Sequence, residues 1–95
     1  MHQVYILKSL KTGCYYVGET SNLVQRLLYH NSIELNTNST KTGIPWEVIY
    51  VIETRDRNVS LKIESHIKRM KSRTYIENMI KYHPDISNKL IAEYS

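Results

Sequence analysis

Three groups of residues have types and spacings that can support chemistry: two tyrosines on a predicted hairpin, an arginine and a histidine four positions apart, and one acid among bases. Arg26 and His30 lie one turn apart on a predicted helix, so both side chains can reach a common ligand, and they form a candidate anion site. Glu64 lies between Lys62 and Lys68. As an alternative to a functional role, Glu64 can form an i, i+4 ion pair with Lys68 worth ~0.3 to 0.5 kcal/mol. The corresponding alternative for Arg26 and His30 is an ordinary solvated helix face.

The tyrosines, Tyr5 and Tyr16, lie in short segments rich in strand-forming residues. A polar stretch containing Gly13 separates the segments, which predicts a hairpin. If the hairpin is symmetric about residues 9–12, Tyr5 directly faces Tyr16 with Cβ atoms ~5 Å apart. The alternative interpretation of this pair is an aromatic cross-strand contact that stabilises the sheet by roughly 0.2 to 1 kcal/mol.

The elements that must position these residues follow from hydrophobic periodicity and capping signals. Residues 4–7 are apolar on both faces, which predicts a strand near the centre of a sheet. Asn22 and Gln25 indicate the start of a helix over residues 22–31. Its expected buried stripe, which leaves Arg26 and His30 on another face, consists of Leu23, Val24, Leu27 and Leu28.

The second half of the chain predicts a loop, a strand and helices. Residues 31–45 are rich in Asn, Ser and Thr, and we expect a flexible loop there. Residues 46–52 predict a third strand that is apolar on both faces, with Trp46, Val48, Tyr50 and Ile52 on one of them, so helices must cover both sides of the sheet.

Three helices are expected after this strand. Asp56 or Asn58 can cap the first of them, whose apolar positions at helical spacing are Val59, Ile63, Ile67 and Met70. Thr74 and Glu77 fit a capping box for the next helix, which ends before Pro84. A short closing helix is suggested by Ile86, Leu90 and Ile91. The expected class is α+β, in the order β-β-α-β-α-α.

Composition limits the possible classes of protein. The 95 residues leave room for a single domain, residues 1–95, and 41% hydrophobic with 23% charged residues is ordinary globular usage. With one cysteine, Cys14, the chain can form neither an intrachain disulfide nor a common zinc site built on cysteines. No apolar run approaches the ~20 residues of a membrane span. We therefore expect a cytoplasmic protein without membrane contact.

The charge distribution favours a polyanionic partner. The net charge is +4, and residues 62–73 alone contain five basic residues against one acid, which equals the whole excess. The basic residues of this segment are Lys62, Lys68, Arg69, Lys71 and Arg73.

Taken together, these positions resemble the GIY-YIG nuclease family. The matching segments are Gln3-Val4-Tyr5, Tyr16-Val17-Gly18 eleven residues on, Arg26 with His30, and the helix segment around Glu64. The stand-alone members, which also carry a Pro-Trp-Glu before the third strand like residues 45–47 here, are the most similar. The resemblance implies a three-stranded antiparallel sheet flanked by helices, and hydrolysis of a phosphodiester with one divalent ion, Mg²⁺ or Mn²⁺.

The resemblance also implies roles for individual residues. Glu64 would be the metal ligand, Arg26 would bind the scissile phosphate, and Tyr5 and Tyr16 would orient or activate the attacking water, with His30 assisting them or holding the phosphate. A tyrosine base needs its pKa lowered from ~10 to ~7, about 4 kcal/mol, which Arg26 and a metal ion can supply. Thr40 and Lys41 stand where close relatives carry a substrate-contacting segment. The expected contacts to the nucleic-acid backbone are Lys68, Arg69, Lys71 and Arg73.

The sequence thus predicts a hydrolase: a divalent-metal-dependent DNA endonuclease with little sequence preference, because no separate targeting module fits into the chain. A protein partner that supplies specificity is compatible with this interpretation. The main alternative is a catalytically silent module that binds nucleic acid or recruits a partner on the same fold. A third is a small α+β interaction domain whose positive charge is incidental.

Overall fold

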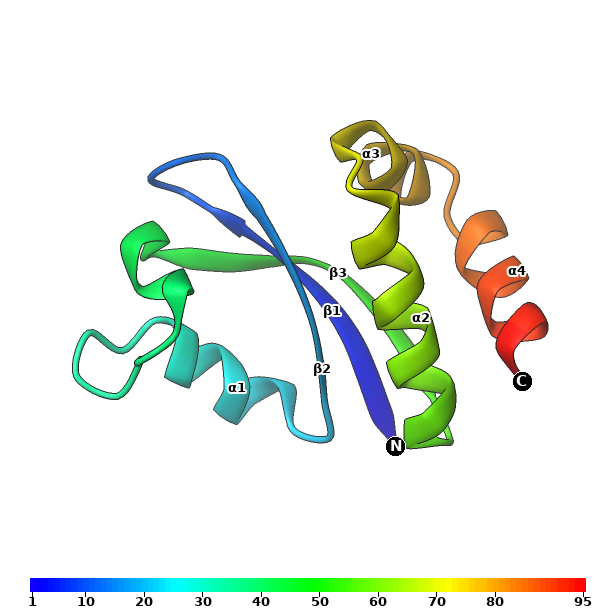
Figure 1. Cartoon of the computed structure of the whole chain (residues 1–95), viewed down its shortest axis with the longest axis horizontal. Helices are drawn as coiled ribbons and strands as arrows, with labels where there is room; N and C mark the ends of the chain where they lie inside the picture. Colours follow the sequence, from blue (N-terminus) through cyan, green and yellow to red (C-terminus); the bar gives the residue numbers. More distant parts are fainter.

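The computed structural model describes all residues from 1 to 95 and consists of one three-stranded sheet with helices on both faces (Figure 1). The strands are antiparallel in the order β2-β1-β3, so β1 is the central strand, as its apolar sequence predicts. No helix is long and apolar enough to cross a membrane. The elements are β1 His2–Ser9, β2 Tyr15–Thr20, α1 Leu23–His30, a 3-10 helix Ser39–Gly43, β3 Trp46–Thr54, α2 Arg57–Met70, α3 Arg73–Lys81 and α4 Asp85–Tyr94. The predicted α+β class and strand arrangement are confirmed.

Successive side chains of β1 pack into two separate cores, one on each face of the sheet. Val4 and Ile6 join a cluster of nine buried residues with α2, α3 and α4. Tyr5 and Leu7 join Trp46 in a smaller cluster on the other face, against α1. Figure 1 shows α1 and the 3-10 helix on one side of the sheet and α2 on the other, with α3 at the C-terminal end of α2 and α4 on the far side of α2. Both faces are covered, as predicted.

The hairpin register differs by two residues from the symmetric loop expected at residues 9–12. Tyr5 pairs with Gly18, and Leu7 pairs with Tyr16. The loop is displaced toward the C-terminus because the Ser9 hydroxyl accepts hydrogen bonds from two backbone N–H groups, those of Lys11 and Thr12, and Gly13 adopts a φ of 76°. A shift of two keeps side chains on the same face. Tyr5 and Tyr16 are therefore diagonal neighbours rather than a directly facing pair.

A bulge in β3 breaks the predicted alternation of that strand. Ile6 pairs with Tyr50 but Leu7 pairs with Val48, which leaves Ile49 as the extra residue. As a result Val48, like Trp46, packs on the α1 side of the sheet, whereas Tyr50 packs on the α2 side. The expectation that Trp46, Val48, Tyr50 and Ile52 share one face was wrong, because side chains keep alternating only while the register is unbroken.

Helix α1 has the predicted length and the predicted cap, Asn22, whose side chain accepts from the Gln25 N–H at 3.1 Å. Its buried face is different from the predicted stripe. Val24 and Leu28 are 73% and 68% exposed, whereas His30 is fully buried and Arg26 is half-buried. The helix turns its functional residues, together with Leu23 and Leu27, toward the sheet because Tyr5 offers them a hydrogen-bond partner there.

Three further local expectations were wrong: the cap of α3, the burial of Met70 and the flexibility of residues 31–45. Helix α3 is capped by Ser72, not by a capping box at Thr74, because Lys71 ends α2 in the left-handed conformation and the next residue caps α3 at once.

In α2, Asp56, one of the two predicted caps, and the buried positions Ile63 and Ile67 are confirmed, whereas Met70 is exposed. The segment 31–45 is a structured connection rather than a flexible loop. It contains the 3-10 helix and is held by hydrogen bonds from Asn31 to the backbone of Trp46 and from Asn36 to the backbone of His30.

Candidate active site

Three of the predicted site residues, His30, Arg26 and Tyr16, lie around the side chain of Tyr5 on the α1 face of the sheet. His30 Nε2 lies 3.0 Å from the Tyr5 hydroxyl oxygen, and Arg26 Nε donates to the same oxygen at 3.4 Å. The rings of Tyr5 and Tyr16 are 6.4 Å apart, and those of Tyr16 and His30 are 4.9 Å apart. Residues from β1, β2 and α1 thus converge on one point.

Gly18 makes room for this arrangement. It lies directly across from Tyr5 in the sheet, and a Cβ atom at this position would be 2.3 Å from the Tyr5 hydroxyl oxygen. Real Cβ atoms do not approach a neighbour that closely, so any other residue would displace the phenol. A glycine inside a strand is typical of such a close approach.

A chain of buried hydrogen bonds fixes the proton on His30. Asn36 Nδ2 donates to the Thr40 hydroxyl at 2.9 Å, and this hydroxyl lies 3.0 Å from His30 Nδ1. Since the hydroxyl has no other acceptor within reach, it donates to Nδ1, and a neutral His30 must carry its proton on Nε2. This assignment makes the Tyr5 oxygen the acceptor of two hydrogen bonds, from His30 and from Arg26.

The electrostatics support a neutral histidine. Burial, assisted by the nearby charge of Arg26, lowers the pKa of His30 to about 4. The imidazole is also fully buried. A neutral, inaccessible ring acts through Tyr5, so the expectation that His30 holds the phosphate directly is corrected.

Tyr5 does not have the acidity expected of a base. Burial raises the pKa of Tyr5, and this effect outweighs the hydrogen bond from Arg26, which lowers it. The expectation that Arg26 makes this phenol acidic is therefore not met by the protein groups alone. Tyr16 is half-buried and opens onto a groove beside α2, which makes it the more accessible of the two phenols.

Arg26 presents its guanidinium to solvent. Its Nε is held by Tyr5, and the guanidinium carbon lies 4.8 Å from the centre of the Tyr29 ring. Neither terminal amino group of the guanidinium makes a hydrogen bond to the protein. A planar fork held at one edge and free at the other matches two oxygens of a phosphate group.

Glu64 reaches the same region from α2, on the other side of the edge strand. Its carboxylate accepts from Lys68 Nζ at 3.2 Å, and this ammonium group lies 5.7 Å from the centre of the Tyr16 ring. The negative charge of Glu64 also contributes to the raised pKa of Tyr5, as expected of a neighbouring group. The predicted ion pair between Glu64 and Lys68 is thus present, together with an approach to the candidate site.

The donor set suits a hard divalent cation bound together with a substrate. No group of three His, Cys, Asp or Glu side chains is arranged to hold a metal ion by itself. Glu64 supplies one carboxylate whose side chain is 18% exposed. Mg²⁺ commonly binds one or two carboxylates and takes its other ligands from water and substrate phosphates, so a single acid fits such an ion.

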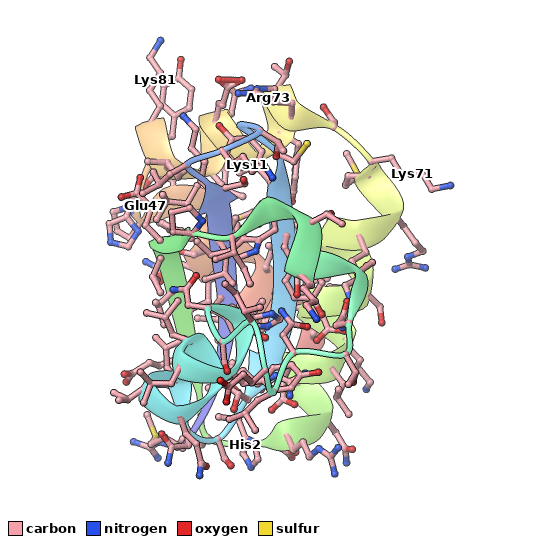
Figure 2. All side chains as sticks on the ribbon, turned by 90° about the vertical axis from the view of Figure 1, so that its left-hand side faces the viewer. His2, Lys11, Glu47, Lys71, Arg73 and Lys81 are labelled. Atoms are coloured by element: carbon pink, nitrogen blue, oxygen red, sulfur yellow. The ribbon has the colours of Figure 1, made fainter.

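The residues predicted to contact the substrate differ in burial: one is inside the protein and the others are on its surface. Thr40 is buried and its hydroxyl is used within the protein, so it positions His30 and its assignment as a substrate contact is corrected. Lys41 on the 3-10 helix is exposed. Figure 2 shows Lys71 projecting into solvent at the end of α2, and Arg73 at the end of the molecule where the β1–β2 hairpin turns. Lys68 and Arg69 are also exposed, so the positive charge predicted for this segment is accessible.

Sequence reasoning missed two residues of this site. Asn36 is almost fully buried, and besides binding Thr40 it donates to the backbone carbonyl of His30 at 2.9 Å. Nothing distinguishes it from the other polar residues of its segment. Gly18 had a usable signal, because a glycine within a predicted strand indicates a position that another group approaches closely.

Comparison with known proteins agrees with this geometry. A family model described as the GIY-YIG catalytic domain matches residues 1–78, which include every residue of the candidate site. Comparisons with curated proteins and with solved structures gave no significant match. The matched region covers most of the chain and extends from β1 into α3. The hairpin with its two tyrosines, the helix with its arginine and the later glutamate are therefore parts of one known domain, and this chain belongs to the GIY-YIG family, a family of nucleases.

Proposed function

We propose that this protein is a divalent-metal-dependent endonuclease that hydrolyses DNA phosphodiester bonds with little intrinsic sequence preference. The observation that carries the proposal is the free edge of the Arg26 guanidinium, whose Nε is held by the Tyr5 hydroxyl at the end of a buried hydrogen-bond chain. Membership of a nuclease family supports the reaction class.

In this proposal Arg26 binds the scissile phosphate and the buried Tyr5 positions Arg26. The free edge of the guanidinium contacts two phosphate oxygens, while the Tyr5 hydroxyl holds Nε at the other edge. The guanidinium stabilises the charge that grows on these oxygens as the new bond forms. The raised pKa of Tyr5 suits this role, because a neutral phenol adds no negative charge beside the phosphate.

Tyr16 orients the attacking water through its hydroxyl group. The water oxygen loses a proton to solvent and forms a bond to phosphorus, and the bond to the leaving oxygen breaks in line with it. The leaving oxygen takes the bonding electrons and a proton from solvent. Tyr16 is assigned this role over Tyr5 because it is accessible from outside and lies next to both His30 and Lys68.

Glu64 is the residue that would hold the divalent ion, Mg²⁺ or Mn²⁺, together with the substrate phosphate. Such an ion, when bound, neutralises charge on the phosphate and the leaving oxygen. Lys68, which pairs with Glu64 in this structure, would then be free to contact a neighbouring phosphate.

The basic residues at the end of α2 support nucleic acid as the substrate. Lysine and arginine contacts to phosphates give affinity that depends on salt and not on sequence. Low sequence preference follows from such contacts. DNA is our choice between the nucleic acids, and RNA is the comparison substrate in the test.

The test is metal-dependent cleavage by the wild-type protein and by Glu64→Ala. We expect Mg²⁺ or Mn²⁺ to support nicking of nicked, branched, single-stranded or duplex DNA, and a chelator to stop it. Removing the carboxylate should reduce cleavage by about a thousandfold or more, because it removes several kcal/mol of charge stabilisation. DNA affinity measured by fluorescence anisotropy should change only a few-fold. Glu47→Ala, which removes an exposed acid at the start of β3, is the matched control.

Each outcome of this assay has a defined meaning. Unchanged cleavage by Glu64→Ala would reject the assignment of the metal ligand. Salt-sensitive DNA binding without cleavage under any metal condition would replace the proposal with the non-enzymatic module. Cleavage of RNA in preference to DNA would correct the substrate.

A further inference from the structure

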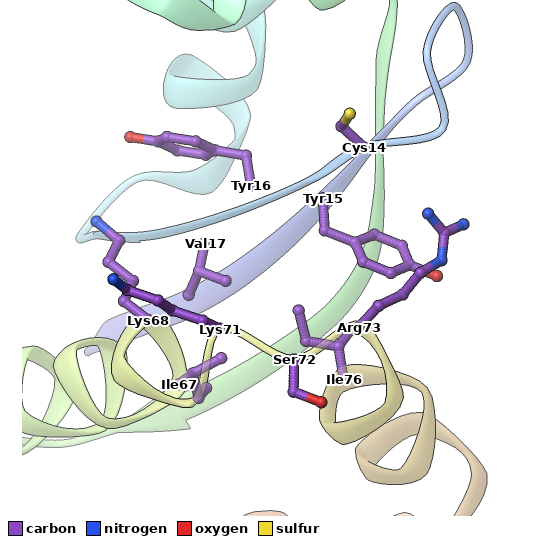
Figure 3. Close-up of a pocket in the computed structure, with 10 residues that line it drawn as sticks. All are labelled: Cys14, Tyr15, Tyr16, Val17, Ile67, Lys68, Lys71, Ser72, Arg73 and Ile76. Atoms are coloured by element: carbon purple, nitrogen blue, oxygen red, sulfur yellow. The ribbon is translucent and has the colours of Figure 1, made fainter.

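A groove with a volume of about 500 Å³ runs between the outer strand β2 and the junction of α2 with α3 (Figure 3). Its floor is apolar and is formed by Val17, Ile67 and Ile76. Its rim is basic: Lys68 and Lys71 lie toward one end and Arg73 toward the other. No acidic residue lines it.

This combination matches one chemical class of ligand. A groove of this size accommodates a small organic group. The apolar floor requires a flat or apolar surface, and the basic rim requires negative charge. A nucleotide whose base is unpaired offers both, whereas the outer surface of a paired duplex offers mainly phosphates and sugars.

Arg73 provides a preorganised surface for a base. Its guanidinium carbon lies 4.8 Å from the centre of the Tyr15 ring, and its Nη1 donates to the Gly13 carbonyl at 3.2 Å. Tyr15 therefore supports one face of the guanidinium, while the side chain remains 57% exposed. Bases of single-stranded nucleic acids stack on guanidinium planes as they do on aromatic rings.

The groove is continuous with the candidate active site. Tyr16 and Lys68 line it, and the same two residues lie next to His30 and Glu64 respectively. Figure 3 shows Tyr15 and Tyr16 on opposite sides of β2, so the edge strand lies between the groove and the α1 face, and the two regions adjoin at this edge. A strand bound at Arg26 can continue into the groove around this edge.

We infer that the groove binds an unpaired nucleotide next to the scissile phosphate, so that the protein prefers strands with a single-stranded segment over fully paired duplex. This inference rests on the proposed function for the identity of the substrate. Its test does not require cleavage, so the two can fail separately.

Cys14, the only cysteine, is exposed and lies at the rim of the groove, with its sulfur on the Tyr16 side of β2, so it reports on a strand bound around this edge. The experiment measures the rate at which a maleimide alkylates Cys14 in the presence of chelator. We expect a saturating single-stranded oligonucleotide to slow alkylation about tenfold and a blunt duplex of the same sequence to slow it less than twofold. An oligonucleotide with consecutive abasic residues should protect like the duplex.

A charge-matched pair of variants tests the groove by affinity. Lys71→Asn with Arg73→Gln removes two rim charges, and asparagine tolerates the left-handed backbone at residue 71. Lys81→Gln with Lys89→Gln removes two exposed charges elsewhere. By anisotropy in chelator, we expect the groove variant to lose about tenfold in affinity for single strands and less than threefold for duplex, and the control to lose less than threefold for both.

Several results would overturn the inference. One is equal protection of Cys14 by single strands and duplex, or no protection at saturation. Another is protection that survives loss of the bases, which would make the groove a contact for the backbone only. Equal losses of affinity in the groove variant and in the control would show that net charge alone accounts for binding. Absence of cleavage would overturn the proposed function but would leave these binding results valid.

Discussion

The two faces of the sheet are built on different principles. On the α2–α4 face, nine buried apolar residues form one continuous cluster. On the α1 face only three apolar residues are fully buried, and the rest of the interior there is occupied by hydrogen-bonded polar side chains, chiefly those of His30, Asn36 and Thr40. The first face stabilises the fold through burial, which has no preferred direction. The second face holds a few atoms in defined positions through hydrogen bonds, which are directional.

Side chains on one side of β1 therefore mainly stabilise the fold, and those on the other side mainly position the residues of the candidate site. Successive residues of this central strand contribute alternately to each face: Val4 and Ile6 to the apolar cluster, Tyr5 and Leu7 to the other. A substitution on one side should therefore change mainly the free energy of unfolding. A substitution on the other should change mainly catalysis or its dependence on pH.

The largest effect is expected on the apolar face. Ile63 of α2 is fully buried, and Ile63→Ala should lower the free energy of unfolding by about 2–5 kcal/mol, because it removes buried apolar groups and leaves a cavity. Urea denaturation measures this value. Ile63→Val is the matched control and should cost only about 0.5–1.5 kcal/mol. Cleavage per folded molecule should stay unchanged; a specific loss of activity would mean that the two faces are not independent.

The next effect is on the polar face. Arg26→Lys keeps the charge but removes the planar fork, so we expect cleavage to fall about a hundredfold. The free energy of unfolding should change by about 1 kcal/mol or less, since a single hydrogen bond to Tyr5 is lost. Single-turnover cleavage and urea denaturation together test this prediction. Cleavage at the wild-type rate would remove Arg26 from the phosphate site.

The buried histidine should make stability dependent on pH. The pKa of His30 is about 4 in the folded protein and ~6.5 when unfolded, so the unfolded state binds more protons between these values. Stability is complete above pH ~6.5 and is lost as the pH falls toward 4. Between pH 7.5 and 5 this group should remove about 2 kcal/mol from the free energy of unfolding. His30→Gln should lack this part of the pH dependence; an identical profile in both proteins would contradict a buried neutral imidazole.

The smallest effect concerns the hydroxyl that fixes the His30 proton. Thr40→Val preserves shape but leaves Asn36 Nδ2 and His30 Nδ1 without this partner, which should cost about 1 kcal/mol in unfolding free energy and a few-fold in cleavage. Thr40→Ser restores the hydroxyl and should restore both values. If serine fails to rescue cleavage, the methyl group of Thr40 matters rather than its hydrogen bonds, and the assigned proton position on His30 loses its support.

Much of the fold was predictable because local signals and the global arrangement agree. The apolar segment 4–7 predicted a central strand, Asn22 and Asp56 predicted the starts of α1 and α2, and all three were confirmed. The errors occurred where long-range contacts override local periodicity. The extra residue at Ile49 reversed the faces to which side chains of part of β3 point. The hydrogen bonds of Ser9 accompany a loop moved by one residue, which changes the hairpin pairing by two.

The members of the candidate site remain a prediction, and the structure adds how these residues are arranged. Tyr5, Tyr16, Arg26 and Glu64 were identified by type and spacing, and the structure brings them to one region. The sequence could not rank the two phenols, because their difference lies in burial. Nor could it identify Asn36, which gains its importance only when the 31–45 segment folds back on His30.

The amino-acid sequence by itself determined the set of side chains that can bind a phosphate and an ion, and the strands and helices that carry them, since residue type and periodicity are local properties. The tertiary structure alone decided which side of α1 faces the sheet, which tyrosine is enclosed and which nitrogen of His30 holds the proton. Those outcomes depend on desolvation and on hydrogen bonds between segments far apart in the chain, and such contacts exist only after the chain has folded.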